Sequence, residues 1–478
     1  MIIKKFNVIL ATDIKGGLGM NNKLPWNFSS DNMFFKNITT HHDILPGLNT
    51  SKNILIMGKN TFKSFNCKAL PNRQFYVITS TMNADEFKDE PDIHFFSCFY
   101  LAYTEAIHYK MCNIWVIGGA NIYNTAIRHF GCNKVYLTEI QSKFETDTDI
   151  LLNNYNIQWT NSIVNRDINK FDDLEYELIF KEGKIYKNIE IQYTECLYDV
   201  LYNGERKQTR NAITLSKFNR TLTHDLHDGF PLLTTKKMFW KGIVEELLFF
   251  IRGETNTKLL SSKGIKIWDG NTSKEFIKKN GLPYEEGIMG PMYGYQWRFF
   301  NKPYTQNSQN NISSDEIGID QLKKVIKEIK EDPNSRRILM TTFNPAQVNE
   351  GVLYPCHSII IQFQVSYPNK LNCSMYIRSS DLLLGLPFNI ASTALLVHII
   401  AQLTDKIPGI LNIILGDYHI YEEHLLAVLT QLKRTPYNLP NLKMKTFASI
   451  EEIEKSSYHD YIIEGYTSHD AITAKMVA

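Results

Sequence analysis

One cysteine has neighbours that suit nucleophilic chemistry. Cys356 stands in the segment Tyr-Pro-Cys-His, with Arg336 and Arg337 upstream and Arg378 downstream. The thiolate is the nucleophilic form of cysteine, and nearby guanidinium groups lower a thiol pKa while they bind an anion such as a phosphate. A lone cysteine is more often a small buried apolar residue, but this set of arginines favours a nucleophile beside an anion site.

A second candidate site lies near the N-terminus. Asp31 is an acid in a helix-like segment whose next apolar residues include Phe34 and Phe35, and Trp26 precedes it. A carboxylate among aromatic rings is in a low dielectric, which raises its pKa and strengthens its attraction for a developing cation. The alternative is a solvated acid in the first turn of a helix.

A pair of glycines marks a third candidate. Gly118 and Gly119 follow a strand-like run and precede a helix-like segment that starts at Asn121. Glycine lets the backbone approach a phosphate, and a helix N-terminus favours an anion. The other interpretation is an ordinary tight turn, and the first strand is not followed by the GxGxxG dinucleotide motif.

The elements that must position these residues differ between the two halves of the chain. In the first half, short β-rich runs alternate with helical patterns, which predicts an α/β domain with a mostly parallel sheet whose closely spaced last two strands could be antiparallel. The expected strands are 7–11, 53–57, 74–79, 113–117, 134–140 and 175–180, and the expected helices are 31–38 and 121–129.

The second half predicts an α+β domain. Its expected helices are 193–202, 241–251, 321–331, 389–403 and 420–433, and its expected strands are 338–342, 358–365, 371–377 and 411–415. A polar stretch at 301–314 predicts a surface loop. With 478 residues, the chain is expected to form domains at 1–181 and 191–478, joined by a short charged junction at 182–190.

Composition excludes several classes of protein. The 52 basic and 50 acidic residues give a net charge of +2, which argues against nucleic acid as a general partner. The seven cysteines contain no CxxC pair, so we expect neither a disulfide framework nor a metal site, and a reducing compartment. No apolar run reaches the length of a membrane span, so we expect a cytoplasmic protein without a membrane partner.

Five motifs of the first half occur together in a specific order: Leu-Pro-Trp at 24–26, and the segments 56–62, 70–73, 116–123 and 136–139. With these motifs, residues 6–181 resemble dihydrofolate reductase. The resemblance implies that Asp31 is the ionised group of the pteridine pocket and that the cofactor is NADPH. The implied folate-binding residues are Trp26, Phe35, Arg73 and Thr138, with Arg73 on the glutamate tail. The implied cofactor-binding residues are Ala11, Gly19, Lys59, Thr61, Thr79, Ser80, Gly118, Gly119, Ala120 and Tyr123.

The second half carries seven further motifs, at 230–237, 290–298, 334–337, 354–357, 376–381, 385–392 and 416–421. With them, residues 191–478 resemble thymidylate synthase, and the whole chain resembles the bifunctional enzymes of protozoa and plants. The resemblance implies that dUMP is methylated to dTMP with 5,10-methylenetetrahydrofolate and that the dihydrofolate product is reduced by the first half. Cys356 would add to uracil C6 and Asn389 would bind the uracil ring. The implied folate-binding residues are Trp268, Tyr293 and Asp381, and the implied dUMP-binding residues are Arg210, Arg336, Arg337, His357, Arg378, Ser379, His419 and Tyr421.

The resemblance also implies a homodimer through the synthase half, because Arg336 and Arg337 would reach the phosphate from the partner subunit. Glu246 would handle protons. Its neighbours at helical spacing, Ile243, Leu247 and Phe250, suggest that it is half-buried with a raised pKa, although a glutamate on a solvated helix face is the commoner case.

Three positions depart from the synthase pattern. The segment after Arg210 lacks the usual glycines, Ile377 replaces a usual glutamine, and Tyr437 replaces a usual arginine. These changes predict a raised KM for dUMP before a loss of activity. They leave open the alternative that the second half is an impaired synthase that mainly serves as a dimerisation scaffold. RNA binding by this half is a third hypothesis, which the net charge disfavours.

Overall fold

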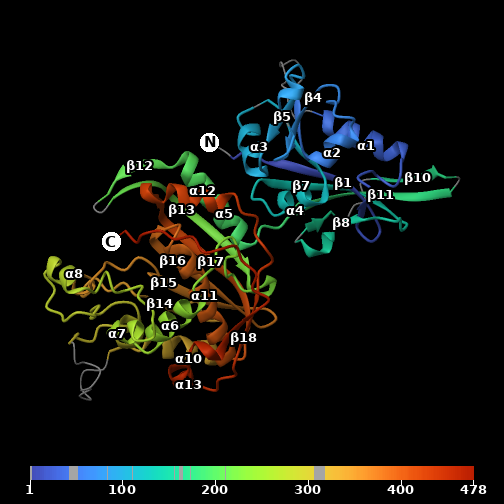
Figure 1. The fold of residues 1–478 in the computed structure, drawn as a ribbon. Helices are drawn as coiled ribbons and strands as arrows, with labels where there is room; N and C mark the ends of the chain where they lie inside the picture. Colours follow the sequence, from blue (N-terminus) through green and yellow to red (C-terminus); the bar gives the residue numbers. More distant parts are fainter. Residues whose placement is uncertain are drawn as a thin grey trace. The chain divides into compact units, whose positions relative to one another are not determined.

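The computed structural model describes residues 3–41, 52–82, 84–109, 111–155, 157–160, 165–172, 174–209, 212–305 and 318–477. The chain divides into two compact units, Met1–Lys187 and Asn188–Ala478 (Figure 1). Strand β11 (Leu174–Ile185) ends the first unit and helix α5 (Ile189–Asn203) begins the second.

The first unit is built on a mixed sheet with the strand order β10-β11-β7-β1-β6-β3-β4-β5, and β9 also pairs with β11. The strands from β7 to β5 in this order are parallel, whereas β11 runs antiparallel to β7, β9 and β10. Strands β3 and β6 are buried along almost their whole length, as parallel strands covered on both faces are. The predicted α/β class and the antiparallel last pair are confirmed.

The bounds of the first unit's elements are β1 Phe6–Asp13, β2 Gly17–Gly19, α1 Ser29–Thr40, β3 Asn53–Gly58, α2 Lys59–Ser64, β4 Arg73–Ile78, β5 Ile93–Phe96, α3 Phe99–Ala106, β6 Ile114–Gly118, α4 Ala120–Ile127, β7 Cys132–Ile140, β8 Thr148–Asp149, β9 Ile157–Trp159 and β10 Asn165–Phe171.

Helix α1 is fixed to the sheet by apolar packing and by one buried amide. Phe34, Phe35 and Ile38 of α1 pack on the core of β3, β4 and β6. Asn53, which is fully buried, donates from Nδ2 to the carbonyl oxygens of Thr39 and His41, at 2.9 Å each, and accepts from a backbone N–H at the start of β6. A buried amide with its hydrogen bonds made fixes direction as well as distance, so the end of α1 has one position on the sheet.

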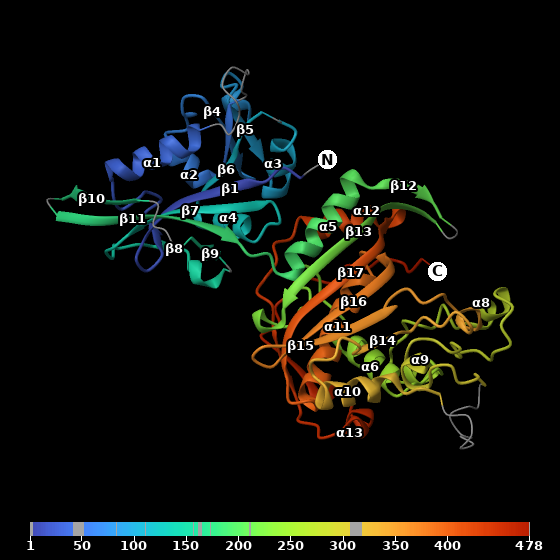
Figure 2. The same ribbon diagram turned by 180° about the vertical axis from the view of Figure 1, so that it is seen from behind.

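The second unit contains a mixed sheet with the order β12-β13-β17-β16-β15-β14, in which β16 and β17 are parallel and the other neighbours are antiparallel. Helices α11 and α5 pack on this sheet, and α6 packs against α11 (Figure 2). Helix α11 is apolar on all sides and most of it is buried, so its length and composition, which would also suit a membrane span, are those of a core helix here.

The bounds of the second unit's elements are β12 Glu205–Gln208, β13 Ile213–Asp225, α6 Trp240–Ile251, α7 Lys258–Ser261, α8 Lys274–Lys279, α9 Gly294–Phe299, α10 Gln321–Glu331, β14 Leu339–Met340, β15 Ile360–Ser366, β16 Lys370–Asp381, α11 Gly385–Leu403, β17 Ile407–Tyr421, α12 Leu425–Leu432, β18 Asn441–Met444, α13 Ile450–Lys455 and β19 Tyr461–Glu464.

Two element predictions in this unit are wrong in extent, and one hairpin was not predicted. Strand β17 runs to Tyr421, so the helix expected at 420–433 is confined to Leu425–Leu432. The expected strand 338–342 is only Leu339–Met340, and the β12–β13 hairpin has no counterpart in the sequence prediction. Pairing of β17 with both β13 and β16 extends it through residues whose helical spacing suggested otherwise.

Candidate active sites

The candidate residues of the first unit lie mainly at or just beyond the carboxyl ends of its parallel strands. Ala11 of β1 and Thr138 of β7 are register partners, and Gly118 ends β6. Lys59 directly follows β3, and Thr79 directly follows β4. Ligands of open parallel sheets bind at this edge, so the topology brings together residues that are far apart in the sequence.

Asp31 lies in the first turn of α1 and is half-buried. Burial raises the pKa of this carboxyl from 3.8 to about 6, and the hydroxyl of Thr138 beside it partly offsets the rise. Tyr123 of α4 also faces Asp31, whose charge contributes to a raised phenol pKa. The predicted rise is confirmed, and it gives a carboxyl that changes its protonation near neutral pH.

The Gly118–Gly119 turn leaves backbone exposed that a side chain at either position would cover. A Cβ added at Gly118 would lie 3.1 Å from the Tyr123 hydroxyl, and one added at Gly119 would lie 3.5 Å from Thr61 Oγ1. Gly118 has a φ of +122°, which side-chain-bearing residues rarely adopt. Gly119 precedes the first residue of α4, Ala120, so exposed backbone and a helix start meet here. These features fit the phosphates of a dinucleotide.

Lys59 and Arg73 are held in different ways. Lys59 Nζ donates to Thr81 Oγ1 at 2.7 Å, next to Thr79 and Ser80, so a cation and hydroxyls meet beyond β3 and β4. Arg73 is 4% exposed, and its guanidinium donates to Thr39 Oγ1 at 3.0 Å. Burial lowers the Arg73 pKa, although a guanidinium stays protonated at any ordinary pH.

The aromatic candidates of the first unit, Trp26 and Phe35, each pack against another aromatic ring. Trp26 is 3% exposed and its ring packs edge-on against Phe144, with centroids 5.2 Å apart. Phe35 is half-buried and stacks on Phe65. Gly19 ends the short strand β2, where an added Cβ would lie 3.0 Å from a hydroxyl of β8. The loop before Trp26 is therefore tied to a segment more than a hundred residues away.

In the second unit, the thiol of Cys356 is held beside Arg378. Arg378 Nη2 lies 3.6 Å from Cys356 Sγ, and the same guanidinium donates to the carbonyl oxygens of Pro355 and Tyr354, at 2.7 and 3.0 Å. The backbone N–H of Arg378 donates to the Cys356 carbonyl at 2.9 Å. Arg378 lies on β16, so this strand places a guanidinium group beside the cysteine.

The predicted lowering of the Cys356 pKa is wrong for the single chain. Burial raises the pKa of this thiol, and the charge of Arg378 lowers it by less. Desolvation of the thiolate outweighs one partly exposed cation. A further cation beside the thiol would lower its pKa again.

A stack of rings connects the cysteine with Glu246. His357 lies on the ring of Tyr293, with centroids 4.3 Å apart, and burial lowers the His357 pKa to about 4. The Tyr293 hydroxyl accepts a hydrogen bond from the backbone N–H of Cys356 at 3.2 Å. The Trp268 ring packs edge-on against the Tyr293 ring. Trp268 Nε1 donates to Glu246 Oε1 at 2.8 Å.

Glu246 is half-buried on α6, as the helical spacing predicts. Burial raises the pKa of its carboxyl to about 7, and the hydrogen bond from Trp268 opposes the rise. Such a group exchanges a proton readily at neutral pH.

The carboxyl ends of β16 and β17 supply the remaining predicted residues. Asp381 pairs in register with His419, and Ser379 pairs with Asp417. His419 Nδ1 lies 2.8 Å from Asp417 Oδ1. Burial raises the Tyr421 pKa to about 12, and the charges of Asp381 and Cys356 add to this rise, so these groups face one another. Asn389 lies half-buried in the first two turns of α11.

Two predicted dUMP-binding residues lie apart from this cluster, and a third is outside the described residues. Arg336 and Arg337 are exposed ahead of β14. Arg210 lies outside the described residues, as does its neighbour Asn211. Ile377, at the position where glutamine is usual, is fully buried in β16.

Sequence reasoning missed residues that orient the candidates. Thr81 holds Lys59, and Asp417 holds His419. Lys236 is buried, donates to the Leu383 carbonyl, and faces Asp381; burial lowers its pKa to about 8. Its place in the motif at 230–237 was a usable signal. Among the described residues, no three His, Cys, Asp or Glu side chains are grouped so as to hold a metal ion.

Comparison with known proteins defines the class as a fusion of two folate enzymes. The family models for dihydrofolate reductase and thymidylate synthase match residues 5–182 and 191–478. Bifunctional dihydrofolate reductase-thymidylate synthases of Paramecium tetraurelia and Zea mays are 38% and 34% identical to the chain, covering 99% of it and 99% and 97% of their own lengths. The enzyme of Plasmodium berghei is 31% identical over 92% of the chain and 86% of its own length.

The chain belongs to the bifunctional dihydrofolate reductase-thymidylate synthase family. It methylates dUMP to dTMP with 5,10-methylenetetrahydrofolate and reduces the resulting dihydrofolate to tetrahydrofolate with NADPH. The alternative of an impaired synthase half is not supported, because the family model spans the whole second unit and the relatives match it over full length.

Proposed function

We propose that Asp31 is the group that supports protonation of dihydrofolate in the first unit. NADPH supplies the hydride. Asp31 would hold the pterin ring and raise its affinity for the proton that must accompany the hydride, while Trp26 excludes water. The observation that carries this role is the raised pKa of Asp31 between aromatic packing and Thr138.

The remaining residues of this site are assigned to different parts of the cofactor and the folate. The Gly118–Gly119 cradle with Ala120, Thr61 and Tyr123 takes the cofactor's pyrophosphate and nicotinamide side, next to Ala11 and Gly19. Lys59, Thr79 and Ser80 take the 2′-phosphate. Arg73 takes the carboxylate of the folate tail, supported by Thr39, which fixes one edge of its guanidinium.

In the second unit, Cys356 is the nucleophile. Its thiolate forms a bond to C6 of the uracil ring, and the C5–C6 π pair moves to the O4 side, where the Asn389 amide donates a hydrogen bond. Arg378, Ser379 and Arg210 bind the phosphate, His357 forms part of the dUMP site, and His419 with Tyr421 binds the ribose hydroxyl. Glu246 moves the proton, and Trp268, Tyr293 and Asp381 hold the folate. The contact of Arg378 with the thiol carries this assignment.

The synthase site is completed by a second copy of the chain. One face of β15 and β14 is open: Ile360, Gln362 and Gln364 of β15 are exposed, and Leu339, the register partner of Gln362, is 45% exposed. An open apolar and polar sheet face of this kind suits an isologous dimer. Arg336 and Arg337 are exposed and would reach the partner's phosphate site, where their charge would oppose the effect of burial on the Cys356 pKa.

Mixed dimers test this assignment. Cys356→Ser and Arg336→Ala chains, each inactive as synthases, should regain about one quarter of wild-type synthase activity after random subunit exchange, because half of the dimers hold one intact site. Cys356→Ser mixed with Arg378→Ala is the matched control and should regain nothing, since Arg378 serves the cysteine of its own chain. No gain in the first mixture, with mixed dimers verified by mass spectrometry, would refute the shared site.

We expect the enzyme to act in the cytoplasm without membrane or nucleic-acid partners. The net charge of +2 argues against a nucleic-acid partner, and the seven cysteines without a CxxC pair suit a reducing compartment. Fractionation of cells and titration with RNA at several salt concentrations would test it.

A further inference from the structure

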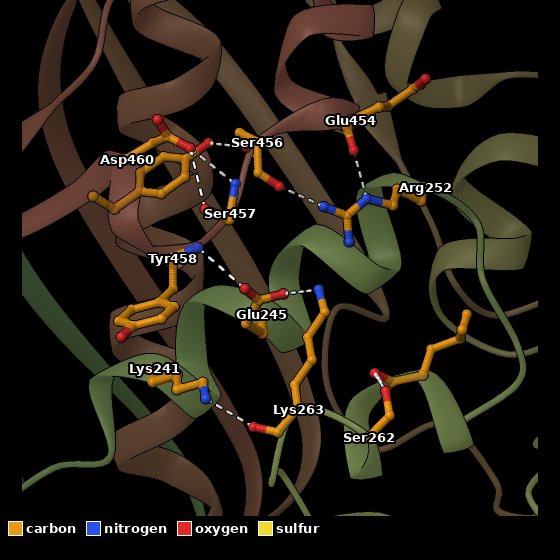
Figure 3. Close-up of polar contacts among 12 residues, drawn as sticks. Lys241, Glu245, Arg252, Ser262, Lys263, Glu454, Ser456, Ser457, Tyr458 and Asp460 are labelled. Carbon is orange, nitrogen blue, oxygen red and sulfur yellow. Dashed lines mark hydrogen bonds and ion pairs between the residues drawn. The ribbon is translucent and has the colours of Figure 1, made fainter.

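Glu245, the neighbour of Glu246 on α6, makes contacts that the reaction described above does not use. Its side chain is almost fully buried. One carboxylate oxygen lies 2.5 Å from Lys263 Nζ, and the other accepts from the backbone N–H of Tyr458 at 3.1 Å (Figure 3). A buried carboxylate is tolerated only when it is paired and hydrogen-bonded, so both partners are needed to keep it in place.

Helix α6 grips Lys263 at two points. Lys241 Nζ donates to the backbone carbonyl of Lys263 at 2.8 Å, while Glu245 binds the Lys263 ammonium group. Lys241 and Glu245 are four residues apart, so they present one face of the helix. The backbone and the side chain of residue 263 are therefore both fixed against α6, as Figure 3 shows.

The segment that starts at Lys263 leads directly to Trp268, the partner of Glu246. Between them, Ile265 is fully buried and its N–H donates to the Leu260 carbonyl. Trp268 Nε1 then donates to Glu246 Oε1 at 2.8 Å. Two adjacent glutamates of α6 thus bind the two ends of one short segment, Glu245 at residue 263 and Glu246 at residue 268.

The segment that carries Tyr458, the second partner of Glu245, is also held in place. Arg252, the residue that caps the end of α6, donates to the carbonyl oxygens of Glu454 and Ser456, at 2.6 and 2.7 Å. Ser457 and Asp460 close a capping box around the turn that contains Tyr458. The N–H that reaches Glu245 therefore comes from a turn anchored to the same helix.

We propose that Glu245 and Lys263 are a positioning pair for the synthase reaction, which holds the segment 263–268 in register on α6 so that Trp268 presents its N–H to Glu246. This inference rests on the proposed role of Glu246. It predicts that the pair acts on the Glu246 carboxyl in two ways: by geometry, and by cancelling the charge of Glu245 next to it on the helix.

The surrounding charges determine the direction of the electrostatic effect. Glu246 is faced by Trp268 and by Tyr293, whose hydroxyl also faces Cys356 and Arg378. The charged and titratable groups on the Glu245 side are Lys241, Arg252, Lys263, Tyr458, Asp460 and Tyr461. Of these, Lys263 makes the ion pair with Glu245. Its removal leaves a carboxylate whose repulsion favours the protonated form of Glu246.

The test uses the full chain and four variants. In Lys263→Met, synthase kcat should fall about 5- to 100-fold with KM for dUMP nearly unchanged. The ionisation in its kcat–pH profile should move to higher pH by roughly half to one unit. Lys263→Arg keeps the charge and should restore both. Glu245→Gln with Lys263→Met removes both charges and should return the pH profile, though not the full rate. Lys327→Met breaks an exposed ion pair of α10 and should change nothing.

The outcomes separate this proposal from the role of Glu246. Glu246→Gln is measured in parallel. If Glu246→Gln is nearly inactive while Lys263→Met keeps the wild-type rate and pH profile, the positioning pair is refuted and the role of Glu246 stands. If Glu246→Gln keeps full synthase activity, the role of Glu246 is refuted and this proposal falls with it. A lower rate in Lys263→Met with an unmoved pH profile that Lys263→Arg does not rescue would refute positioning in favour of general loss of structure.

Discussion

Replacing Asp31 by asparagine should stabilise the first unit while it disables the reductase. The folded environment moves the pKa of this carboxyl from 3.8 to about 6. One pH unit corresponds to about 1.4 kcal/mol, so ionising Asp31 costs the folded state up to about 3 kcal/mol above pH 6, and about 1–2 kcal/mol after allowance for its partial exposure. Asparagine carries no such cost.

The direction of the Asp31 pKa shift determines the pH range over which stability changes. A raised carboxyl pKa means that the folded state holds its proton more tightly, so the wild type loses stability as pH rises from about 4 to about 6 and no further above that. The advantage of Asp31→Asn should therefore be small at pH 4 and complete by pH 7. Hydrogen exchange of β1 and β7 amides in the full chain, compared between variant and wild type at each pH, measures it without assuming a single unfolding transition.

The same variant should lower hydride transfer by orders of magnitude at pH 7, with partial recovery in acid, because solvent then protonates the substrate. NADPH affinity should hardly change. Asp89→Asn, at an exposed acid of the same unit, is the matched control and should alter neither property. Equal amide protection in Asp31→Asn and wild type at pH 7, or an unchanged reductase rate there, would refute the reasoning.

Three further perturbations follow from the sites. Lys59→Ala should raise KM for NADPH by about 10- to 100-fold and KM for NADH much less, since only NADPH carries the 2′-phosphate; equal losses in a two-cofactor assay would move Lys59 to the shared pyrophosphate. Gly118→Ala should cost about 1–2 kcal/mol of stability and weaken NADPH binding in a titration, because its φ of +122° and the hydroxyl 3.1 Å away both oppose a Cβ; wild-type affinity would contradict the cradle. Arg378→Met should raise the Cys356 pKa further and slow its alkylation at pH 7 by roughly tenfold, followed at the Cys356 peptide by mass spectrometry; unchanged alkylation would contradict the contact.

Local patterns were enough to predict the parallel core of the first unit, although β5, β10, α2 and α3 were missed. Buried strands separated by helices predict a parallel sheet, and the aromatic residues around Asp31 predict its raised pKa, because both depend mainly on nearby sequence. Glu246 was predictable for the same reason, since residues at helical spacing decide how far it is buried.

Long-range pairing explains the errors in the second unit. Residues 417–421 belong to β17 because they pair with residues 214–218 of β13, a strand that lies far earlier in the chain. The pKa of Cys356 depends on how deeply the folded chain buries its thiol, and the number of nearby arginines in the sequence carries no such information. Likewise, the grip of Glu245 on Lys263 joins two segments that only the fold brings together.

The most direct test of the account is a coupled assay on the purified full chain with dUMP, 5,10-methylenetetrahydrofolate and NADPH. The account predicts one NADPH oxidised for each dTMP formed. It also predicts that Cys356→Ser abolishes both signals in this mixture yet oxidises NADPH at the wild-type rate when dihydrofolate is added. Formation of dTMP by Cys356→Ser, or NADPH oxidation from dUMP without dTMP, would contradict the assignment of two consecutive reactions to the two units.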